Sequence, residues 1–185
     1  LVAGGAGDPN YATSLGVAGG GSGLTTVAAD QVYVGTAADT FTAKSIPDCE
    51  APNYLRYDTT GHNWSCVAPP MDIASYFAGK PTNSQVMLRI RFASAVRLPA
   101  SLTGSVFYIG VNPTATLVLD IRKRLSGSTS SSIGSLSIST GGVYTPTFAS
   151  QTDFAVGDHL EVINAASADA TAADFSHTFL GTRIP

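Results

Sequence analysis

The segment Leu117-Val118-Leu119-Asp120-Ile121-Arg122 decides the fold class of this chain. Its first, third and fifth residues are large and apolar, and Val, Asp and Arg fill the positions between them. Successive side chains of a β-strand point to opposite faces of the sheet. The alternation therefore predicts a strand with one face aimed at a core.

Segments that read as strands follow one another through the C-terminal part of the chain. Gly, Pro, Asn or Ser signals separate them about every ten residues, which is typical of a two-sheet sandwich. Gly134, set among Ser and apolar residues, predicts a bulge. We predict an all-β fold with a jelly-roll-like β-sandwich head at 81–185, whose strands are 86–92, 95–98, 105–111, 115–122, 132–139, 144–148, 159–165 and 174–180.

Ala68-Pro69-Pro70 is the best candidate boundary, because proline removes ladder donors and stiffens the backbone. Before it, 54–57 and 62–67 read as a hairpin in which Gly61 takes the positive φ of a tight turn. After it, 72–78 predicts a short helical turn capped by Asp72. The expected organisation is a stem at 1–67, a connector at 68–80 and the head at 81–185.

The first 23 residues hold almost no large apolar side chain and end in a glycine-rich run. Such a stretch stays mobile unless neighbouring chains order it. Residues 32–34 and 40–43 alternate in the manner of strands, but over too short a length for an independent sheet. We therefore expect an irregular, glycine-rich stem that is ordered in an oligomer.

Charge excludes several classes of partner. The formal net charge is −3 and only 12% of residues are charged, so no broad basic field is present to bind nucleic acid. The one basic run, Arg122-Lys123-Arg124, is expected at a solvated sheet edge that blocks strand addition. No apolar run approaches the roughly 20 residues that span a bilayer, so we expect no membrane insertion. The chain lacks an initiating Met and reads as part of something longer.

Cys49 and Cys66 are the two cysteines of the chain, and no other Cys or His pair has a metal-binding spacing. We expect no metal site. The two cysteines could bridge across the hairpin if they face each other. Two thiols packed as small hydrophobes are the alternative, which a reducing cytoplasm favours.

Catalysis has little basis in this sequence. The three histidines lie in separate strands or turns, away from any known nucleophile signature, and most acids fall at turns and strand starts. We expect no enzyme activity, no catalytic residue and no cofactor. His177 shares a face with Phe175 and Phe179 if the strand register allows, and is then a candidate oligomer-interface residue. Trp64 is expected to be a packing anchor rather than a sugar platform.

The chain resembles the fibre proteins of tailed phages and gene-transfer-agent-type virions. The stem carries Gly19-Gly20-x-x-Gly23-Leu24-Thr25-Thr26, a Val-Tyr-Val-Gly strand and the cysteine-bracketed hairpin, and residues 85–92, 97–100, 154–162 and 179–183 are similar to a β-rich head module. This resemblance implies a structural virion protein. Such a protein would be made in the bacterial cytoplasm and form a homotrimer. The trimer would bind other virion tail proteins and attach the extracellular particle to a host cell-surface glycan or protein.

Under this hypothesis the loops of the head touch the receptor. The candidate receptor-contact residues are Asn112, Tyr144 beside Gly141-Gly142, and Asp169. Repetition across three copies would strengthen weak contacts. Two alternatives remain open: an architectural head-fibre or capsid-decoration protein without receptor binding, and a bacterial surface adhesin or filament subunit.

Overall fold

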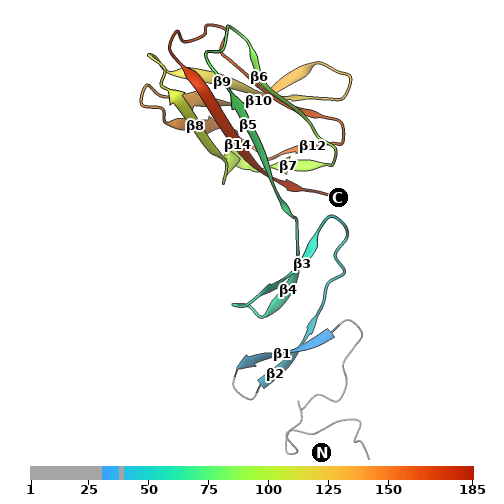
Figure 1. The fold of residues 1–185 in the computed structure, drawn as a ribbon. Helices are drawn as coiled ribbons and strands as arrows, with labels where there is room; N and C mark the ends of the chain where they lie inside the picture. Colours follow the sequence, from blue (N-terminus) through green and yellow to red (C-terminus); the bar gives the residue numbers. More distant parts are fainter. Residues whose placement is uncertain (1–30, 38–39) are drawn as a thin grey trace, which may run out of the picture. The chain divides into compact units, whose positions relative to one another are not determined.

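A computed structural model describes residues 31–37 and 40–185 of the chain. The glycine-rich stretch and most of the stem motif that carries the resemblance lie outside these residues. The chain divides into two compact units, Leu1–Val67 and Ala68–Pro185, which we call the first and the second unit. Figure 1 labels most of the strands named below.

The described part of the first unit consists of two antiparallel hairpins. Strands β1 (Gln31–Ala37) and β2 (Thr40–Ser45) form one, and β3 (Tyr54–Asp58) and β4 (Asn63–Val67) form the other. Cys49 and Cys66 form a disulfide, with Cα atoms 5.4 Å apart. It ties the segment before β3 to strand β4.

The turn of the second hairpin is organised by Asp58 rather than by a glycine conformation. Its carboxylate accepts hydrogen bonds from the N–H groups of Thr60 at 3.0 Å and Gly61 at 2.9 Å. The positive φ, 51°, belongs to His62, so the prediction that placed it at Gly61 is wrong. The side chain of Asp58 replaces the left-handed glycine as the means of closing the turn.

Among the described residues of the first unit whose burial is defined, none is buried. Within the described part of this unit, the closest pair of rings is Trp64 and Tyr57, with centroids 4.9 Å apart across β4 and β3. Tyr54 and Leu55 remain exposed. This unit therefore has no hydrophobic core in its described part.

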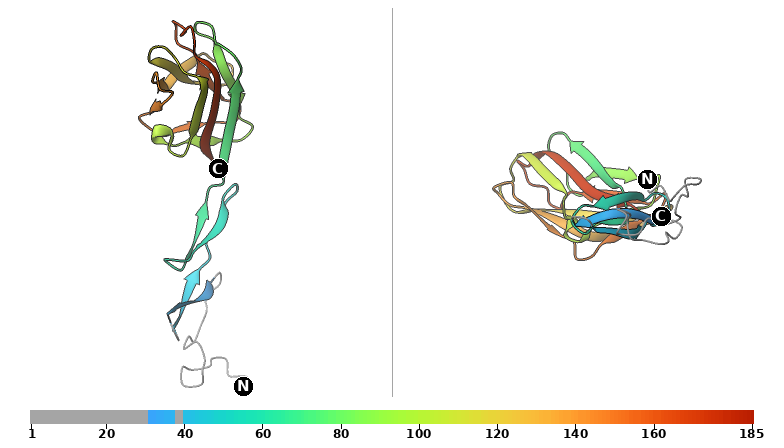
Figure 2. Two further views of the ribbon diagram at one scale, coloured as in Figure 1. Left: turned by 60° about the vertical axis from the view of Figure 1, so that its left-hand side comes forward. Right: turned by 90° about the horizontal axis from the view of Figure 1, so that it is seen from below.

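The second unit is built from two antiparallel sheets, seen as two layers in Figure 2. Sheet 1 has the order β11-β10-β9-β13-β6, and sheet 2 has the order β12-β7-β14-β5, with β8 also paired to β14. A 3-10 turn, η2 (Ala100–Leu102), follows β7. The strands are β5 (Pro70–Phe77), β6 (Val86–Arg91), β7 (Val96–Leu98), β8 (Val106–Val111), β9 (Leu117–Arg124), β10 (Ser130–Ile138), β11 (Tyr144–Thr147), β12 (Thr152–Phe154), β13 (His159–Ile163) and β14 (Ala173–Arg183).

One hydrophobic cluster receives side chains from both sheets. Leu117, Leu119 and Ile121 of β9 are all buried in it, and Val118 is exposed. Phe175 and Phe179 enter from sheet 2. The predicted all-β class is confirmed, while the jelly-roll class stays a prediction.

The bulge predicted near Gly134 is present as a register shift between Ser132 and Gly134 in the β10–β9 pair. A Cβ at Gly134 would lie 2.6 Å from both Phe148 Cδ2 and the main-chain oxygen of Thr147. Only a residue without a side chain fits there. The bulge lets buried Phe148 lie over β10.

Two elements differ from the prediction. Residues 72–78 are not helical: 72–77 belong to strand β5, which pairs with β14, so the expected connector at 68–80 contributes a full strand to sheet 2. The basic run 122–124 ends β9, which lies between β10 and β13 inside sheet 1. It is therefore not at a sheet edge, and the expected edge role is wrong.

Candidate receptor-binding surface

The loops that carry the three sequence candidates meet at one end of the second unit. The Thr171 hydroxyl donates to the Asn112 main-chain oxygen at 3.1 Å. Gly142 has φ +76° and approaches Asn112 so closely that a Cβ there would lie 2.5 Å from Oδ1. The structure thus brings Asn112, the turn before Tyr144 and the Asp169 loop together.

Asp169 holds this loop end in shape. Its Oδ2 accepts from Thr114 N and Oγ1 at 2.9 and 2.8 Å, and its Oδ1 accepts from Thr171 N and Oγ1 at 2.8 and 2.7 Å. The hydrogen bonds from Thr171, followed by those from Thr114, hold the pKa of the Asp169 carboxyl well below its usual range. Its carboxylate is engaged by the loops themselves, so Asp169 positions the surface more than it offers a free contact.

Tyr144 is half-buried rather than exposed. Its ring stacks on Phe107 with centroids 5.4 Å apart and meets His177 edge-on at 6.3 Å. Burial raises the pKa of the Tyr144 phenol above its ordinary value. Tyr144 packs between the sheets, whereas its neighbours Val143 and Thr145 are exposed.

His177 lies in the core and not at an outer surface. The residue is 1% exposed, and it shares the inner face of β14 with Phe175 and Phe179 as the alternation predicted. Burial lowers its pKa to about 4. The expected interface role is therefore wrong for the described structure: a second copy cannot reach this ring without unpacking the unit.

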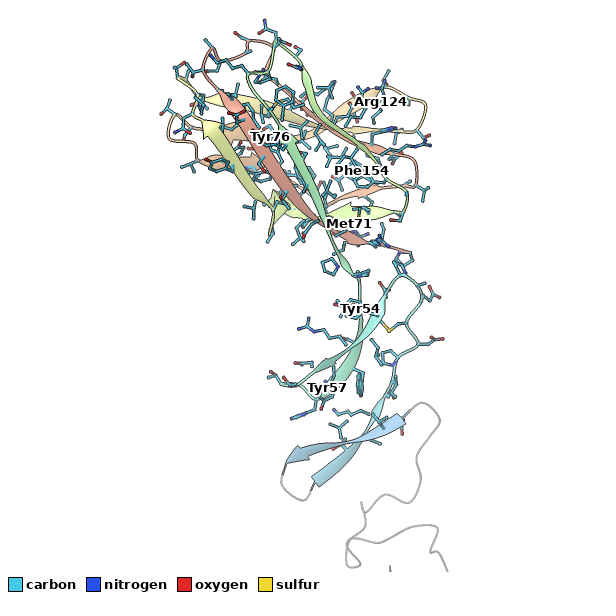
Figure 3. All side chains as sticks on the ribbon, in the orientation of Figure 1. Tyr54, Tyr57, Met71, Tyr76, Arg124 and Phe154 are labelled. Carbon is cyan, nitrogen blue, oxygen red and sulfur yellow. A yellow bond between two sulfur atoms is a disulfide. The ribbon has the colours of Figure 1, made fainter. Side chains whose placement is uncertain are left out.

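The outer face of sheet 2 carries two tyrosines that the sequence analysis did not single out as contacts. Register places Ser176 of β14 opposite Tyr76 of β5 on one side and Tyr108 of β8 on the other. Tyr76 is 66% exposed and Tyr108 is 64% exposed. The two rings flank a serine hydroxyl across three adjacent strands, and Figure 3 labels Tyr76 in this row. We call Tyr76, Ser176 and Tyr108 the tyrosine row.

Asp174 closes one end of the tyrosine row. Its Oδ1 accepts from Tyr76 Oη at 3.3 Å and from Gly79 N at 2.7 Å, and its own φ is +60°. Gly110 lies so close that a Cβ there would be 2.9 Å from the Asp174 Cβ. Desolvation and then the Asp174 charge raise the pKa of Tyr76, so the phenol stays protonated. Tyr76 is therefore held by a side-chain hydrogen bond to Asp174, which is itself bonded to the main chain at Gly79.

The tyrosine row offers apolar rings together with hydroxyl groups on one face of sheet 2. Exposed tyrosine rings offer large apolar area with a polar tip and lose little side-chain entropy on binding. Within the described part of the chain no group of three His, Cys, Asp or Glu side chains is arranged to hold a metal ion. No described segment forms a helix long and apolar enough to cross a membrane.

The sequence does not reveal the tyrosine row as long as Tyr76 is placed in the helical turn that 72–78 predicts. Read with a period of two, Met71, Ile73 and Phe77 face the core and Tyr76 faces solvent. That alternation was the available signal. Tyr108 gave no local signal, because its role depends on Ser176 and Tyr76, which are distant in the sequence.

Comparison with known proteins gives no relative for this chain: no family model, no curated protein and no solved structure matches it.

Proposed function

We propose that this chain is a structural virion protein of the phage-fibre type, which assembles as a homotrimer with other tail proteins and attaches the particle to a host cell-surface receptor. The first unit serves as fibre stem, and the tyrosine row of the second unit contacts the receptor, a glycan or a protein. The protein is made in the bacterial cytoplasm and becomes extracellular on release. Binding, not catalysis, is its role.

The observation that carries the proposal is the contrast between the two units. The second unit has its own hydrophobic core, whereas no described residue of the first unit whose burial is defined is buried. Two-stranded hairpins are marginally stable in isolation. Further copies of the chain supply the burial that the first unit lacks, and they also multiply weak receptor contacts.

The tyrosine row supports attachment at the second unit. Two mostly exposed aromatic rings on one face of the sheet offer apolar area that a partner can cover. Their hydroxyls and that of Ser176 can exchange hydrogen bonds with a sugar or a peptide group. The row also adjoins the loop end, because Tyr144 Oη donates to the Tyr108 main-chain oxygen.

Light scattering and surface binding test the proposal together. The whole chain should have about three times its monomer mass of 18.9 kDa. It should also bind members of an array of bacterial surface polysaccharides or a panel of bacterial strains. Tyr76→Ala with Tyr108→Ala should abolish binding, and Tyr54→Ala, which removes an exposed tyrosine of the first unit, should not.

Each other result has a defined meaning. A trimer that binds neither array nor cells favours the architectural alternative. A monomer at all concentrations, or equal loss of binding in the Tyr54 variant, contradicts the proposal.

The disulfide favours a second candidate function, a bacterial surface adhesin or filament subunit. Cys49–Cys66 closes a loop with a sequence separation of 17 residues, and such bonds form in oxidising compartments, which an exported protein enters and a protein assembled in the cytoplasm does not. An export signal encoded upstream, with the protein found on the cell that makes it, would support this candidate over the virion role.

A further inference from the structure

Four arginines lie side by side on the outer face of sheet 1, at positions that the strand register determines. His159 of β13 lies opposite Arg91 of β6 and Arg124 of β9. Two residues along, Glu161 lies opposite Arg89 and Arg122 on the same strands. The two rows alternate with the buried residues of the sheet, so all these side chains share one face. We call this set the arginine face; Figure 3 labels Arg124 in it.

The buried carboxylate of Glu161 contacts two of these arginines and fixes their side chains. Glu161 is 1% exposed although it lies on the outer side of the sheet. Its Oε1 is 2.6 Å from Arg89 Nε and 3.5 Å from Arg124 Nη1, and the side chains of these two arginines remain 48% and 37% exposed. Arg124 Nε also donates to Ser128 O at 2.9 Å. Two guanidinium groups are thus fixed by hydrogen bonds and ion pairs, while part of each side chain still faces solvent.

Positive charge remains after this pairing. Arg122 is 3.2 Å from Asp120, and the Arg91 side chain has no carboxylate partner within the described ranges. Four guanidinium groups against the carboxylates of Glu161 and Asp120 leave two net positive charges on a face of a chain whose net charge is −3. Arg122 Nε also lacks an aligned hydrogen-bond acceptor. The contact with Asp120 is short enough for an ion pair, but its angle does not suit a hydrogen bond.

Hydroxyl groups and a hollow adjoin the arginines. Ser130 lies opposite Arg124, Ser132 opposite Arg122, and Ser135 opposite Asp120. Beside Arg122 and Asp120 the surface is hollowed, with an open volume of about 540 Å³ that Val118, Ile163 and Asn164 also line. The face therefore combines cationic donors, hydroxyls and a depression.

We propose that the arginine face binds an acidic polysaccharide whose carboxylate groups pair with Arg91 and Arg122. Guanidinium forks match carboxylates in geometry, and serine hydroxyls match the neutral hydroxyls of sugars. Two net charges are few for a nucleic acid, whose affinity rests on many neutralised phosphates. This inference deepens the proposed function and rests on it for its biological setting, because it assigns an acidic glycan to a second receptor surface on the opposite sheet.

Protection of a sheet edge does not account for the arrangement. Edge strands often carry basic residues that prevent pairing with other chains. Arg89 and Arg91 lie on β6 at the end of sheet 1, but Arg122 and Arg124 lie on β9 in its interior. An interior strand has no free edge to protect.

The test uses polygalacturonate and highly methyl-esterified pectin, which share a backbone but differ in charge. Binding of the whole chain to each is measured by isothermal calorimetry at about 50 and about 500 mM NaCl, because screening weakens exposed charge pairs. We expect binding to polygalacturonate alone, weaker at high salt. Arg91→Gln with Arg122→Gln should weaken it at least tenfold. Arg183→Gln, an exposed arginine of sheet 2, is the matched control.

The outcomes separate this inference from the proposed function. Loss of binding in the double variant but not in the control supports it, and Arg91→Gln alone serves if the double variant unfolds. No binding of the unaltered chain, equal loss in the control, equal binding to the esterified pectin, or tighter binding to a DNA duplex overturns it. Trimer mass and binding through the tyrosine row are measured separately, so either idea can fail alone.

Discussion

Tyr144 donates its phenolic hydrogen bond to the main-chain oxygen of Tyr108 at 3.1 Å, and so joins β11 of sheet 1 to β8 of sheet 2. The main chain of Tyr108, whose exposed ring belongs to the tyrosine row, is therefore hydrogen-bonded to the half-buried Tyr144. The two tyrosines have different tasks: Tyr144 supports the surface and Tyr108 presents it.

Truncation of Tyr144 should destabilise the second unit. Tyr144→Phe removes one hydrogen bond and should cost about 1 kcal/mol in free energy of unfolding. Tyr144→Ala also removes the ring that packs on Phe107 and His177, and should cost about 3 kcal/mol. Urea denaturation measures both. Wild-type stability of the Ala variant would show that this ring does not pack in the core.

Acid should destabilise the second unit through His177. Its pKa is lowered by burial to about 4 in the folded protein, against 6.5 when unfolded. Below pH 6.5 the unfolded chain binds the proton more readily, so stability is complete above that pH and falls as the pH drops towards 4. The loss attributable to this group is about 3 kcal/mol.

His177→Phe provides the comparison for that prediction, because other groups titrate in the same range. The difference in unfolding free energy between wild type and variant should change by about 3 kcal/mol between neutral pH and about pH 4. A pH-independent difference would mean that His177 does not titrate on unfolding.

The disulfide should stabilise the first unit. Closing a loop of this length contributes about 3 kcal/mol in the chain-entropy model. Cys49→Ser with Cys66→Ser should speed proteolysis between β2 and β4, with the second unit unaffected. Mass spectrometry after iodoacetamide treatment checks the bond itself: adducts should form at both cysteines only after reduction, and adducts without reductant would contradict it.

Gly142→Ala should loosen the loop end. The position has φ +76°, and the added Cβ would lie 2.5 Å from Asn112 Oδ1. Gly127 is the matched control, because its φ is +74° and nothing lies within 4 Å of its Cβ position. Each change costs about 1 kcal/mol for the backbone, and Gly142→Ala should cost more. Equal melting temperatures of the two variants would show that the loops are not in contact.

Much of the second unit follows from its sequence. Leu117, Leu119 and Ile121 form a buried stripe because a strand alternates its faces, and that pattern needs no knowledge of partners. The helical turn predicted at 72–78 is wrong, because Ile73, Tyr76 and Phe77 fit a helical stripe over so short a length. Pairing with β14 makes this segment a strand. In this chain, local patterns predict that a secondary-structure element is present more reliably than they predict whether it is a helix or a strand.

The candidate surfaces depend on pairings between distant segments. Tyr144 follows two glycines and reads as exposed, yet Phe107 and His177 cover its ring. Glu161 alternates as an outward residue and is outward, but arginines from β6 and β9 bury it. Neither outcome has a local signal, because the covering residues come from other strands.

Strand β14 has a consequence for synthesis. It pairs with β5, β7 and β8, and all three precede it in the chain. Sheet 2 therefore cannot close until residues 173–183 have left the ribosome exit tunnel. Until then the edge of β5 that pairs with β14 has no partner, because β5 is synthesised about a hundred residues before β14. If the chain forms the proposed trimer, nascent chains on one messenger RNA have time to meet through their first units before their second units are complete, and subunit association is then coupled to translation.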